Sequence, residues 1–475
     1  MGFVGRKLEL AELGKQLDVV RRGRRADRGV AVMIRGRRRI GKSRLVTEFV
    51  RQSGTPNVYF QAARRAPIGA ELARLGDAIA ESGLPGSDLL RGARFDSLTQ
   101  ALGLLAQTLP VDSPSVVTID ELPWLLEGIQ GGAGELQRAW DLHLSQKPVL
   151  LLLLGSDIGM MERLTAHDQP FHGRATELVL RALNPKDVGE ATGTAGFDAF
   201  DAALITGGQP LVVQEWEPGM SLEDFLRDSF ASPTSALLVN GARVLDSEFR
   251  EGDAARQVLA ALGAHGERTF SGIQQVVGSS DGMGAAQLAR ILKTLAEKRV
   301  IAADEPLSAR PAPKDRRYRI DDPALRFWLA FVEASSGDVD RGRSDLACRR
   351  VQDGYSAWRG RAVEPLVREA LARLLPDDRW PGAREIGGWW PRTNRPEIDL
   401  VAADKRPAKR IVFVGTIKWR QNKPIKPEEM SALAADAASV PGATPKTALV
   451  AVCPAGGGAE ADAVWTAEDL MEAWP

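Results

Sequence analysis

The first part of the chain alternates between short apolar runs and longer segments with helical periodicity. Five runs rich in β-branched and other apolar residues lie at 30–35, 58–61, 115–120, 149–154 and 177–180. This alternation predicts an α/β fold, in which a parallel sheet is covered by helices on both faces. We assign this core to residues 1–183.

The pattern changes after the core. Residues 184–252 are mainly helical and contain a Gly-Gly-Gln-Pro turn at 207–210, which predicts a helical lid. Residues 253–325 carry three helical segments and then two short strands around a loop with Pro and Arg, which predicts a winged helix. A helical bridge over 326–354 leads to a small α/β domain over 355–475.

Length and composition fit this arrangement. A chain of 475 residues is long enough for about three cores, and its 62 basic and 62 acidic residues balance. The two cysteines, Cys348 and Cys453, lie too far apart in sequence to suggest a disulfide framework or a zinc site. The apolar run at 149–154 is too short to cross a membrane. We therefore expect a cytoplasmic protein with no membrane partner.

Residues 36–43 read GRRRIGKS and fill the pattern GxxxxGK(S/T) between a predicted strand and a predicted helix. In such a loop the backbone N–H groups face phosphate, Lys42 reaches the β and γ oxygens, and the Ser43 hydroxyl holds Mg²⁺. The sequence therefore predicts a nucleotide and Mg²⁺ as ligands. The expected nucleotide-binding residues of the loop are Gly36, Arg39, Ile40, Gly41, Lys42, Ser43 and Arg44.

Polar residues end two of the other predicted strands. Asp120 and Glu121 follow the apolar residues 116–119, and an adjacent strand end should bring Asp120 to the metal. Glu121 is then the expected base that orients the attacking water. Ser156 follows the run at 149–154 and is either a sensor of the γ-phosphate or an ordinary turn serine.

Residues 1–250 resemble the archaeal-type ATPases, which belong with the AAA and STAND P-loop families. The resemblance rests on the two phosphate motifs, the turn at 207–210 and the opening residues Phe3, Val4, Gly5, Arg6, Glu9 and Leu10. It implies ATP as the nucleotide, with Val4, Gly5 and Arg6 lining the adenine pocket and Pro210 packing near it. Plain packing is the alternative for these residues.

Arg174 ends a segment that resembles the Gly-Arg before the last strand of these ATPases. The resemblance implies an arginine finger on the γ-phosphate, because arginine stays charged and offers a planar fork. Whether it would act in cis or in trans stays open at this point, and a homo-oligomer is therefore also open. The alternative is a solvated surface arginine.

Basic residues in the predicted winged helix suggest DNA as a partner. Side chains on the third helix could face a groove, and arginines near the wing could contact phosphate. The alternative is a role as an interdomain lever. The residues concerned are Gln287, Arg290, Lys293 and Lys298 on the helix, and Arg316, Arg317 and Arg319 near the wing.

The last domain resembles the restriction-endonuclease-type nucleases that are often fused to archaeal-type ATPases. The resemblance implies a Mg²⁺ site in which Glu364, Asp399 and Lys418 match the family pattern. Thr416 stands where a second acid is expected, so the metal lacks one anionic ligand. Glu397 lies on the same strand face as Asp399, but displaced along it. We expect an impaired nuclease that still binds DNA, with a purely structural domain as the alternative.

Together these features predict a slowly hydrolysing, switch-like ATPase that associates with DNA and carries a degenerate nuclease-like domain. A second hypothesis is a nucleotide-gated signalling or scaffold protein whose partners are proteins.

Overall fold

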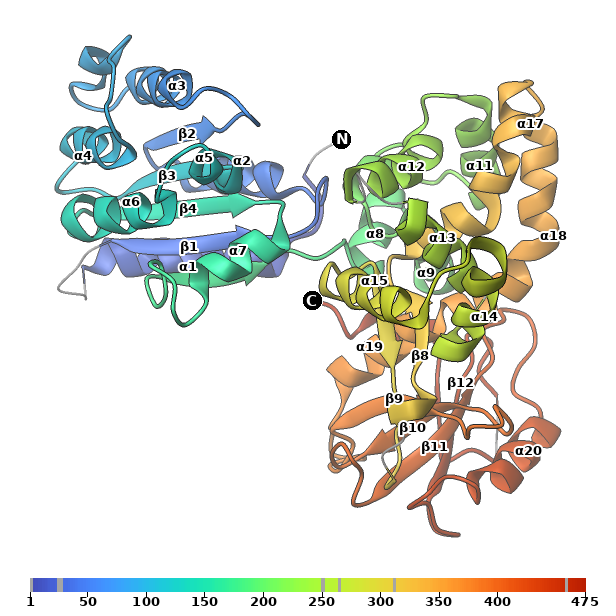
Figure 1. Cartoon of the computed structure of the whole chain (residues 1–475). Coiled ribbons are helices and arrows are strands. Elements are labelled where there is room, and N and C mark those ends of the chain that lie inside the picture. The colour runs from blue at the N-terminus through green and yellow to red at the C-terminus, as the bar shows by residue number, and fades with distance from the viewer. Residues whose placement is uncertain (1–2, 24–28, 249–252, 264–265, 311–312, 458–459) are drawn as a thin grey trace. The chain divides into compact units, whose positions relative to one another are not determined.

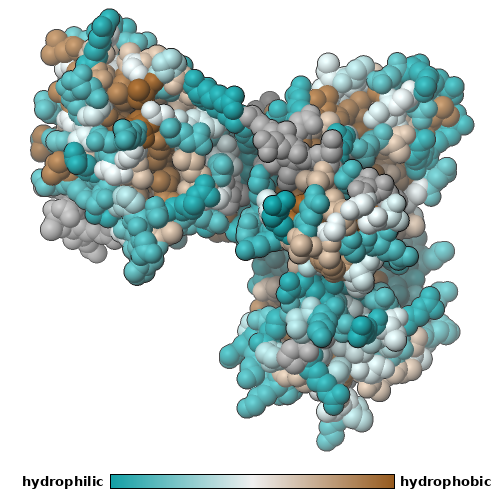
Figure 2. Space-filling view, viewed as in Figure 1, coloured by the Kyte–Doolittle hydropathy of each residue, from teal (hydrophilic) through white to brown (hydrophobic). Residues whose placement is uncertain are grey.

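The computed structural model describes residues 3–23, 29–248, 253–263, 266–310, 313–457 and 460–475. The chain divides into two compact units. The first unit consists of residues 6–182, and the second consists of residues 3–5 and 183–475. Among the described residues, no helix combines the length and the apolar character that a membrane span requires. On the face shown in Figure 2, hydrophilic residues predominate and hydrophobic residues form small separate patches.

The first unit is built on a five-stranded sheet in the order β2-β3-β4-β1-β5, and all its pairings are parallel (Figure 1). The three inner strands, β1, β3 and β4, are almost entirely buried, which matches their largely apolar sequences. The edge strands β2 and β5 are partly exposed. The predicted α/β fold with a parallel sheet is therefore confirmed. The strands are β1 (Val30–Arg35), β2 (Asn57–Gln61), β3 (Ser115–Asp120), β4 (Val149–Gly155) and β5 (Ala175–Val179).

Helices cover both faces of this sheet (Figure 1). On one face Met33, Ile119 and Leu153 form a core with α3, α4, α5 and α6. On the sheet's other side α1 packs against β1 and β4. The helices are α1 (Lys7–Arg22), α2 (Lys42–Ser53), α3 (Ile68–Ala80), α4 (Leu98–Thr108), α5 (Leu122–Glu127), α6 (Gly132–Ala139) and α7 (Ile158–Thr165), with short turns at Ser87–Leu90 and Trp140–Leu144.

The second unit begins with the predicted lid. The Asn184 side chain caps α8 and Pro185 occupies its first turn, while α9 ends at Gly207, whose φ of 59° is left-handed. The helices are α8 (Pro185–Thr192), α9 (Gly196–Thr206), α10 (Pro210–Val213), α11 (Leu222–Ala231) and α12 (Ala236–Glu248).

Three helices and a three-stranded antiparallel sheet follow, which is the arrangement expected of a winged helix. The strand order is β6-β8-β7, and β6 was not predicted because it is only two residues long. The elements are α13 (Asp253–Leu262), β6 (Arg268–Thr269), α14 (Phe270–Asp281), α15 (Ala285–Glu297), β7 (Ile301–Asp304) and β8 (Arg317–Ile320), with a short turn at Pro313–Asp315 before β8.

A helical bridge then leads to a second five-stranded sheet, in the order β13-β12-β11-β10-β9, which is antiparallel from β9 to β11 and parallel beyond. The bridge and helices are α16 (Pro323–Phe327), short turns over Trp328–Val332 and Glu333–Ser335, α17 (Ser336–Asp340), α18 (Ser344–Ala362), α19 (Glu364–Leu374), α20 (Pro427–Ala437) and α21 (Ala467–Met471). The strands are β9 (Glu385–Trp389), β10 (Ile398–Ala403), β11 (Ile411–Ile417), β12 (Ala448–Val452) and β13 (Ala463–Trp465).

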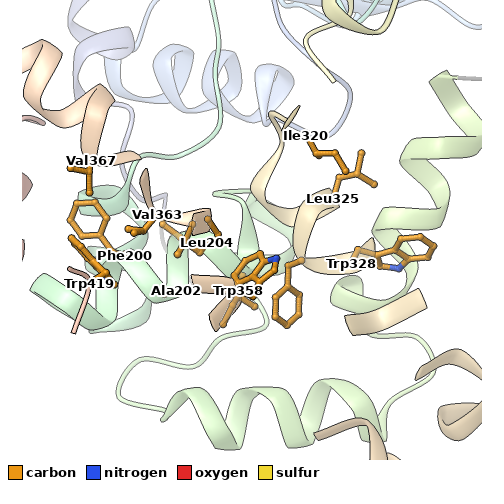
Figure 3. Close-up of a cluster of buried hydrophobic side chains, with 14 of the residues drawn as sticks. Phe200, Ala202, Leu204, Ile320, Leu325, Trp328, Trp358, Val363, Val367 and Trp419 are labelled. Carbon is orange, nitrogen blue, oxygen red and sulfur yellow. The ribbon is translucent and has the colours of Figure 1, made fainter. Parts of the chain in front are cut away.

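One hydrophobic core runs through this second unit. It joins Phe200 of α9, Ile320 of β8, Trp358 of α18 and Trp419 after β11 (Figure 3). Phe200 and Trp419 lie with ring centroids 4.9 Å apart. The division between the two units falls between residues 182 and 183. The predicted domain bounds stay predictions.

Candidate nucleotide site and nuclease-like site

The phosphate loop joins the end of β1 to the start of α2. Two of its residues have left-handed backbones, Arg39 with φ of 64° and Gly41 with φ of 91°. A Cβ on Gly36 would lie 2.5 Å from the carbonyl oxygen of Leu180, so only glycine fits there. The first N–H groups of α2 have no acceptor within the helix, which makes the loop suited to an anion.

Lys42 lies where the motif predicts. Its side chain is buried, and Nζ donates to the carbonyl oxygens of Gly36 at 2.9 Å and Arg37 at 3.1 Å. The loop carbonyl oxygens therefore hold the ammonium group beside the backbone N–H groups that would bind the same phosphates. Arg39 and Arg44 are exposed at the same loop, and the Arg38 guanidinium carbon lies 5.3 Å from the ring centre of Trp124.

The end of β3 brings Asp120 to this loop. Ser43 Oγ donates to Asp120 Oδ2 at 2.6 Å, and the backbone N–H of Glu121 donates to Oδ1 at 2.9 Å. The prediction that Asp120 comes from an adjacent strand was wrong in one respect, because β4 lies between β1 and β3. A hydroxyl and a buried carboxylate are hard oxygen donors, and this donor set fits Mg²⁺.

Tyr59 is a residue of the site that sequence reasoning missed. It lies on β2, and its phenol donates to the same Asp120 Oδ2 at 2.5 Å. Burial, together with the hydrogen bond to Asp120, raises the pKa of Tyr59 above its usual range, so the phenol stays protonated. Only the β2–β3 pairing reveals this contact, since no motif includes a tyrosine at this point.

Glu121 and Ser156 are also brought together. Glu121 has a left-handed backbone with φ of 54°, and Ser156 Oγ lies 3.0 Å and 2.9 Å from its two carboxylate oxygens. A hydroxyl has one proton, so it donates to one oxygen at a time. Ser156 therefore positions the carboxylate of the predicted base.

The opening residues divide between the two units. Arg6 is buried, donates to the Ile40 carbonyl oxygen at 3.0 Å and pairs with Glu9 at 3.1 Å, so it supports the phosphate loop. Val4 packs against the core of the second unit, and a Cβ on Gly5 would lie 2.6 Å from Asp187 Cγ. A role for these residues in an adenine pocket stays a prediction.

Pro210 begins α10 after the predicted turn. Gly207 and Gly208 both have φ of 59°, and the Leu183 N–H donates to the Gly208 carbonyl oxygen at 2.9 Å. A Cβ on Gly208 would collide with the Leu183 carbonyl oxygen, and one on Gly207 would lie 2.6 Å from the backbone nitrogen of Ala324. The turn therefore ties the start of the second unit to α16.

Arg174 does not lie at the phosphate loop. Nε and Nη2 each donate to Asp141 at 2.8 Å, and Arg174 precedes β5 at the level of Val30. The loop follows the opposite end of β1, roughly 16 Å away along the strand. Action of Arg174 in cis is therefore not supported by this arrangement, while action in trans stays a prediction.

All three wing arginines pair with carboxylates of the protein. Arg317 and Arg319 are largely inaccessible, which corrects the expectation that they face DNA, whereas Arg316 is 42% exposed and its contact with DNA stays a prediction. Arg316 pairs with Glu305, and Arg319 pairs with Asp304 at 2.8 Å and Asp321 at 2.7 Å. These carboxylates occupy the donors that phosphate would need. On α15, by contrast, the side chains that lie exposed are Gln287, Arg290 and Lys293, while Lys298 is partly exposed.

The third wing arginine, Arg317, reaches the nuclease-like domain. It is buried, pairs with Glu397, donates to Asn394 Oδ1 at 3.0 Å and stacks 4.3 Å above Trp390. Arg317 also lies 3.7 Å from Glu267. The Glu397 carboxylate is thus ion-paired with Arg317.

The wing itself lies along the edge strand of the C-terminal sheet. The Leu307 N–H donates to the Gly388 carbonyl oxygen on β9 at 2.8 Å, and the Leu307 side chain is fully buried in the C-terminal core. The Ala309 N–H donates to the Pro441 carbonyl oxygen at 2.9 Å. The wing therefore covers an edge strand that would otherwise be open to pairing.

In the nuclease-like site, β10 and β11 place Asp399 against Thr416. Asp399 Oδ2 accepts from Thr416 Oγ1 at 2.9 Å and from the Ile417 N–H at 2.9 Å. Thr416, at the position expected for an acid, thus supplies a hydrogen-bond donor. Lys418 is partly exposed and follows β11. Within the described parts of the chain, no group of three or more His, Cys, Asp or Glu side chains is arranged to hold a metal.

Glu364 joins this site through Arg368 of α19, a residue the sequence did not single out. Arg368 donates to Glu364 Oε2 at 2.9 Å and to the Asp399 carbonyl oxygen at 3.0 Å. Burial raises the pKa of Glu364 to about 8, against the opposing effect of Arg368. The neighbouring carboxylates of Asp399 and Glu267 add to the rise. Arg368 thus supplies a positive charge beside Glu364 and Asp399.

Comparison with known proteins gives distant similarities. A family model described as "Archaea bacterial proteins of unknown function" (DUF234) matches residues 328–430. The chain is 24% identical over 430 residues to an uncharacterized protein, MJECL04, of Methanocaldococcus jannaschii, which covers 89% of this chain and 88% of that protein. None of these matches assigns a role to a residue.

Two solved structures are similar at low identity. The Walker-type ATPase paby2304 of Pyrococcus abyssi is 17% identical with a TM-score of 0.47, covering 69% of this chain and 96% of that one. The Aeropyrum pernix ORC2 protein in its ADPNP–ADP complexes is 14% identical with a TM-score of 0.44, covering 73% of this chain and 95% of that one.

Proposed function

We propose that the protein binds ATP together with Mg²⁺ at the phosphate loop and hydrolyses it slowly. The convergence of Ser43 on Asp120 beside the buried Lys42 carries this proposal, because it places a cation and a hard-oxygen pair at one loop. Bound Mg²⁺ would neutralise phosphate charge, with Ser43 and Asp120 holding it. Glu121 would orient the attacking water once Ser156 releases it.

Nucleotide binding is tested by calorimetry with a non-hydrolysable ATP analogue and Mg²⁺. Lys42→Ala should weaken binding by at least tenfold, since a charge-assisted contact to phosphate is lost. Lys15→Ala is the matched control, because Lys15 lies on α1 with a side chain that is 74% exposed. Equal affinity for Lys42→Ala and the parent protein would refute the site assignment.

Turnover is tested separately from binding. Glu121→Gln keeps the shape and the hydrogen bond to Ser156 but cannot act as a base. We expect it to bind ATP like the parent protein and to release phosphate at least a hundredfold more slowly. Unchanged phosphate release would remove Glu121 from the mechanism.

For the rest of the chain we propose association with DNA through α15, and a C-terminal domain that is a degenerate nuclease. The exposed Arg290 and Lys293 support DNA contact. The alternative is a nucleotide-gated scaffold with protein partners. Affinity for duplex DNA that falls steeply with salt distinguishes the two, because phosphate contacts release counterions. A salt-independent or absent signal favours the scaffold.

A further inference from the structure

The carboxylate of Asp120 has more hydrogen-bond donors than the two phosphate motifs supply. Its Oδ2 atom accepts from two hydroxyl groups, Ser43 Oγ at 2.6 Å and the phenol of Tyr59 at 2.5 Å. Its Oδ1 atom accepts from the Glu121 N–H. A carboxylate oxygen offers about two lone-pair positions, so Oδ2 is already saturated by protein groups.

Oδ2 is also the oxygen of Asp120 that a metal ion held by Ser43 would use. Asp120 is 1% exposed and its main chain is fixed in β3, so the carboxylate has little freedom to present another edge. One of the two hydroxyls must lose its hydrogen bond to Oδ2 when the metal, or a water bound to the metal, contacts this oxygen. Ser43 is itself an expected ligand of the metal and therefore keeps its place. The phenol of Tyr59 is then the group that must move away from Oδ2.

We propose that Tyr59 gates the Mg²⁺ site: its phenol donates to the same oxygen of Asp120 as Ser43 and must be displaced when Mg²⁺ binds with ATP. Tyr59 is thus a positioning residue that competes with the metal for Asp120 and lowers metal affinity. This inference rests on the proposed ATP site and adds a control on its metal step.

The chain offers a matched control on the neighbouring strand. Thr118 lies opposite Tyr59 in the β2–β3 register and is buried. Its hydroxyl has no hydrogen-bond partner among the described residues. Thr118→Val therefore removes a buried hydroxyl close to Tyr59 without touching Asp120, just as Tyr59→Phe removes one oxygen from the ring.

The experiment measures the affinity of the full chain for a non-hydrolysable ATP analogue by calorimetry, in Mg²⁺ and in EDTA. We expect Tyr59→Phe to tighten binding in Mg²⁺ by roughly tenfold, the ratio that a hydrogen bond to a charged group corresponds to. Binding in EDTA should be unchanged, and Thr118→Val should behave like the parent protein. Direct titration of Mn²⁺ followed by electron paramagnetic resonance should show the same tightening.

Each other outcome has a defined meaning. If Tyr59→Phe leaves the Mg²⁺-to-EDTA affinity ratio unchanged, or weakens binding in Mg²⁺, the gate is overturned while the ATP site stands. If the ratio rises equally in Thr118→Val, the effect is not specific to the phenol and the gate is again overturned. If the parent protein binds no nucleotide in either buffer, the proposed function itself fails. A thermal unfolding midpoint close to that of the parent confirms that each variant is folded.

Discussion

The buried carboxyl group of Glu364 should make the stability of the second unit depend on pH. Burial raises the pKa of Glu364 from 4.5 to about 8, and the nearby Asp399, Glu267 and Glu397 add to the rise while Arg368 opposes it. Between these two pH values the folded protein holds a proton that the unfolded chain has lost. The free energy of unfolding should therefore fall as pH rises from about 4.5 to about 8 and then level off.

The size of the effect follows from the shift and from the surroundings of the group. One pKa unit corresponds to about 1.4 kcal/mol, so the shift from 4.5 to about 8 sets an upper limit of about 5 kcal/mol. The Glu364 side chain is 19% exposed and lies 2.9 Å from Arg368, and both facts reduce the loss. We expect roughly 2 kcal/mol between pH 5 and pH 9 from this group.

Urea unfolding followed by tryptophan fluorescence at pH 5, 7 and 9 measures this dependence. Glu364→Gln removes the titration while keeping an acceptor for Arg368, so its stability should change less with pH and should exceed that of the parent at pH 9. The control is Glu369→Gln on the same helix, where the side chain is 43% exposed. Asp201, whose pKa burial raises to about 6, contributes equally to all three proteins. Parallel curves for parent and Glu364→Gln would refute the reasoning.

Three further changes test other parts of the structure. Thr118→Val should raise the free energy of unfolding by about 1 kcal/mol in urea titrations, because it removes a buried hydroxyl that has no hydrogen-bond partner among the described residues. A loss of stability would show that the hydroxyl does form a hydrogen bond. Arg317→Leu should lower the free energy of unfolding of the second unit by about 2 kcal/mol. Arg290→Ala should leave this free energy unchanged and weaken DNA binding instead. If Arg317→Leu weakened DNA binding without loss of stability, Arg317 would be a DNA contact after all. Thr416→Glu should raise Mn²⁺ affinity in calorimetry and Asp399→Ala in that background should abolish the gain; no gain would leave the nuclease resemblance without support.

The sequence predicted the strands of the first unit closely, and the reason is physical. β1 and β3 have the predicted bounds, because a strand buried on both faces is mostly apolar and the polar residues at its end mark where it stops. The phosphate loop was also predictable, since the left-handed backbone at Gly41 is a local property of the chain. The apolar pattern of a strand and the conformation of a short loop can both be predicted from the sequence, because they depend on neighbouring residues.

What the sequence could not predict depends on contacts between distant segments. Tyr59 was missed because only strand order brings β2 beside β3. Arg317 was assigned to DNA because its partners, Glu267 and Glu397, are 50 and 80 residues away along the chain. A basic residue in a loop looks the same in sequence whether it faces solvent or a buried carboxylate.

In the C-terminal domain, protein groups stabilise two neighbouring acidic side chains. A partly buried carboxylate needs donors, and Asp399 receives them from Thr416 and the Ile417 N–H, while Arg368 supplies the positive charge beside Glu364. A threonine at position 416 is thus compatible with a stable site, because its hydroxyl donates to Asp399, whereas a carboxylate at this position would repel it. The wing, in which Leu307 and Ala309 donate to backbone oxygens of the C-terminal domain, covers the β9 edge of the same sheet. The side chains of Gln287, Arg290 and Lys293 on α15 lie exposed, and their contact with DNA stays a prediction.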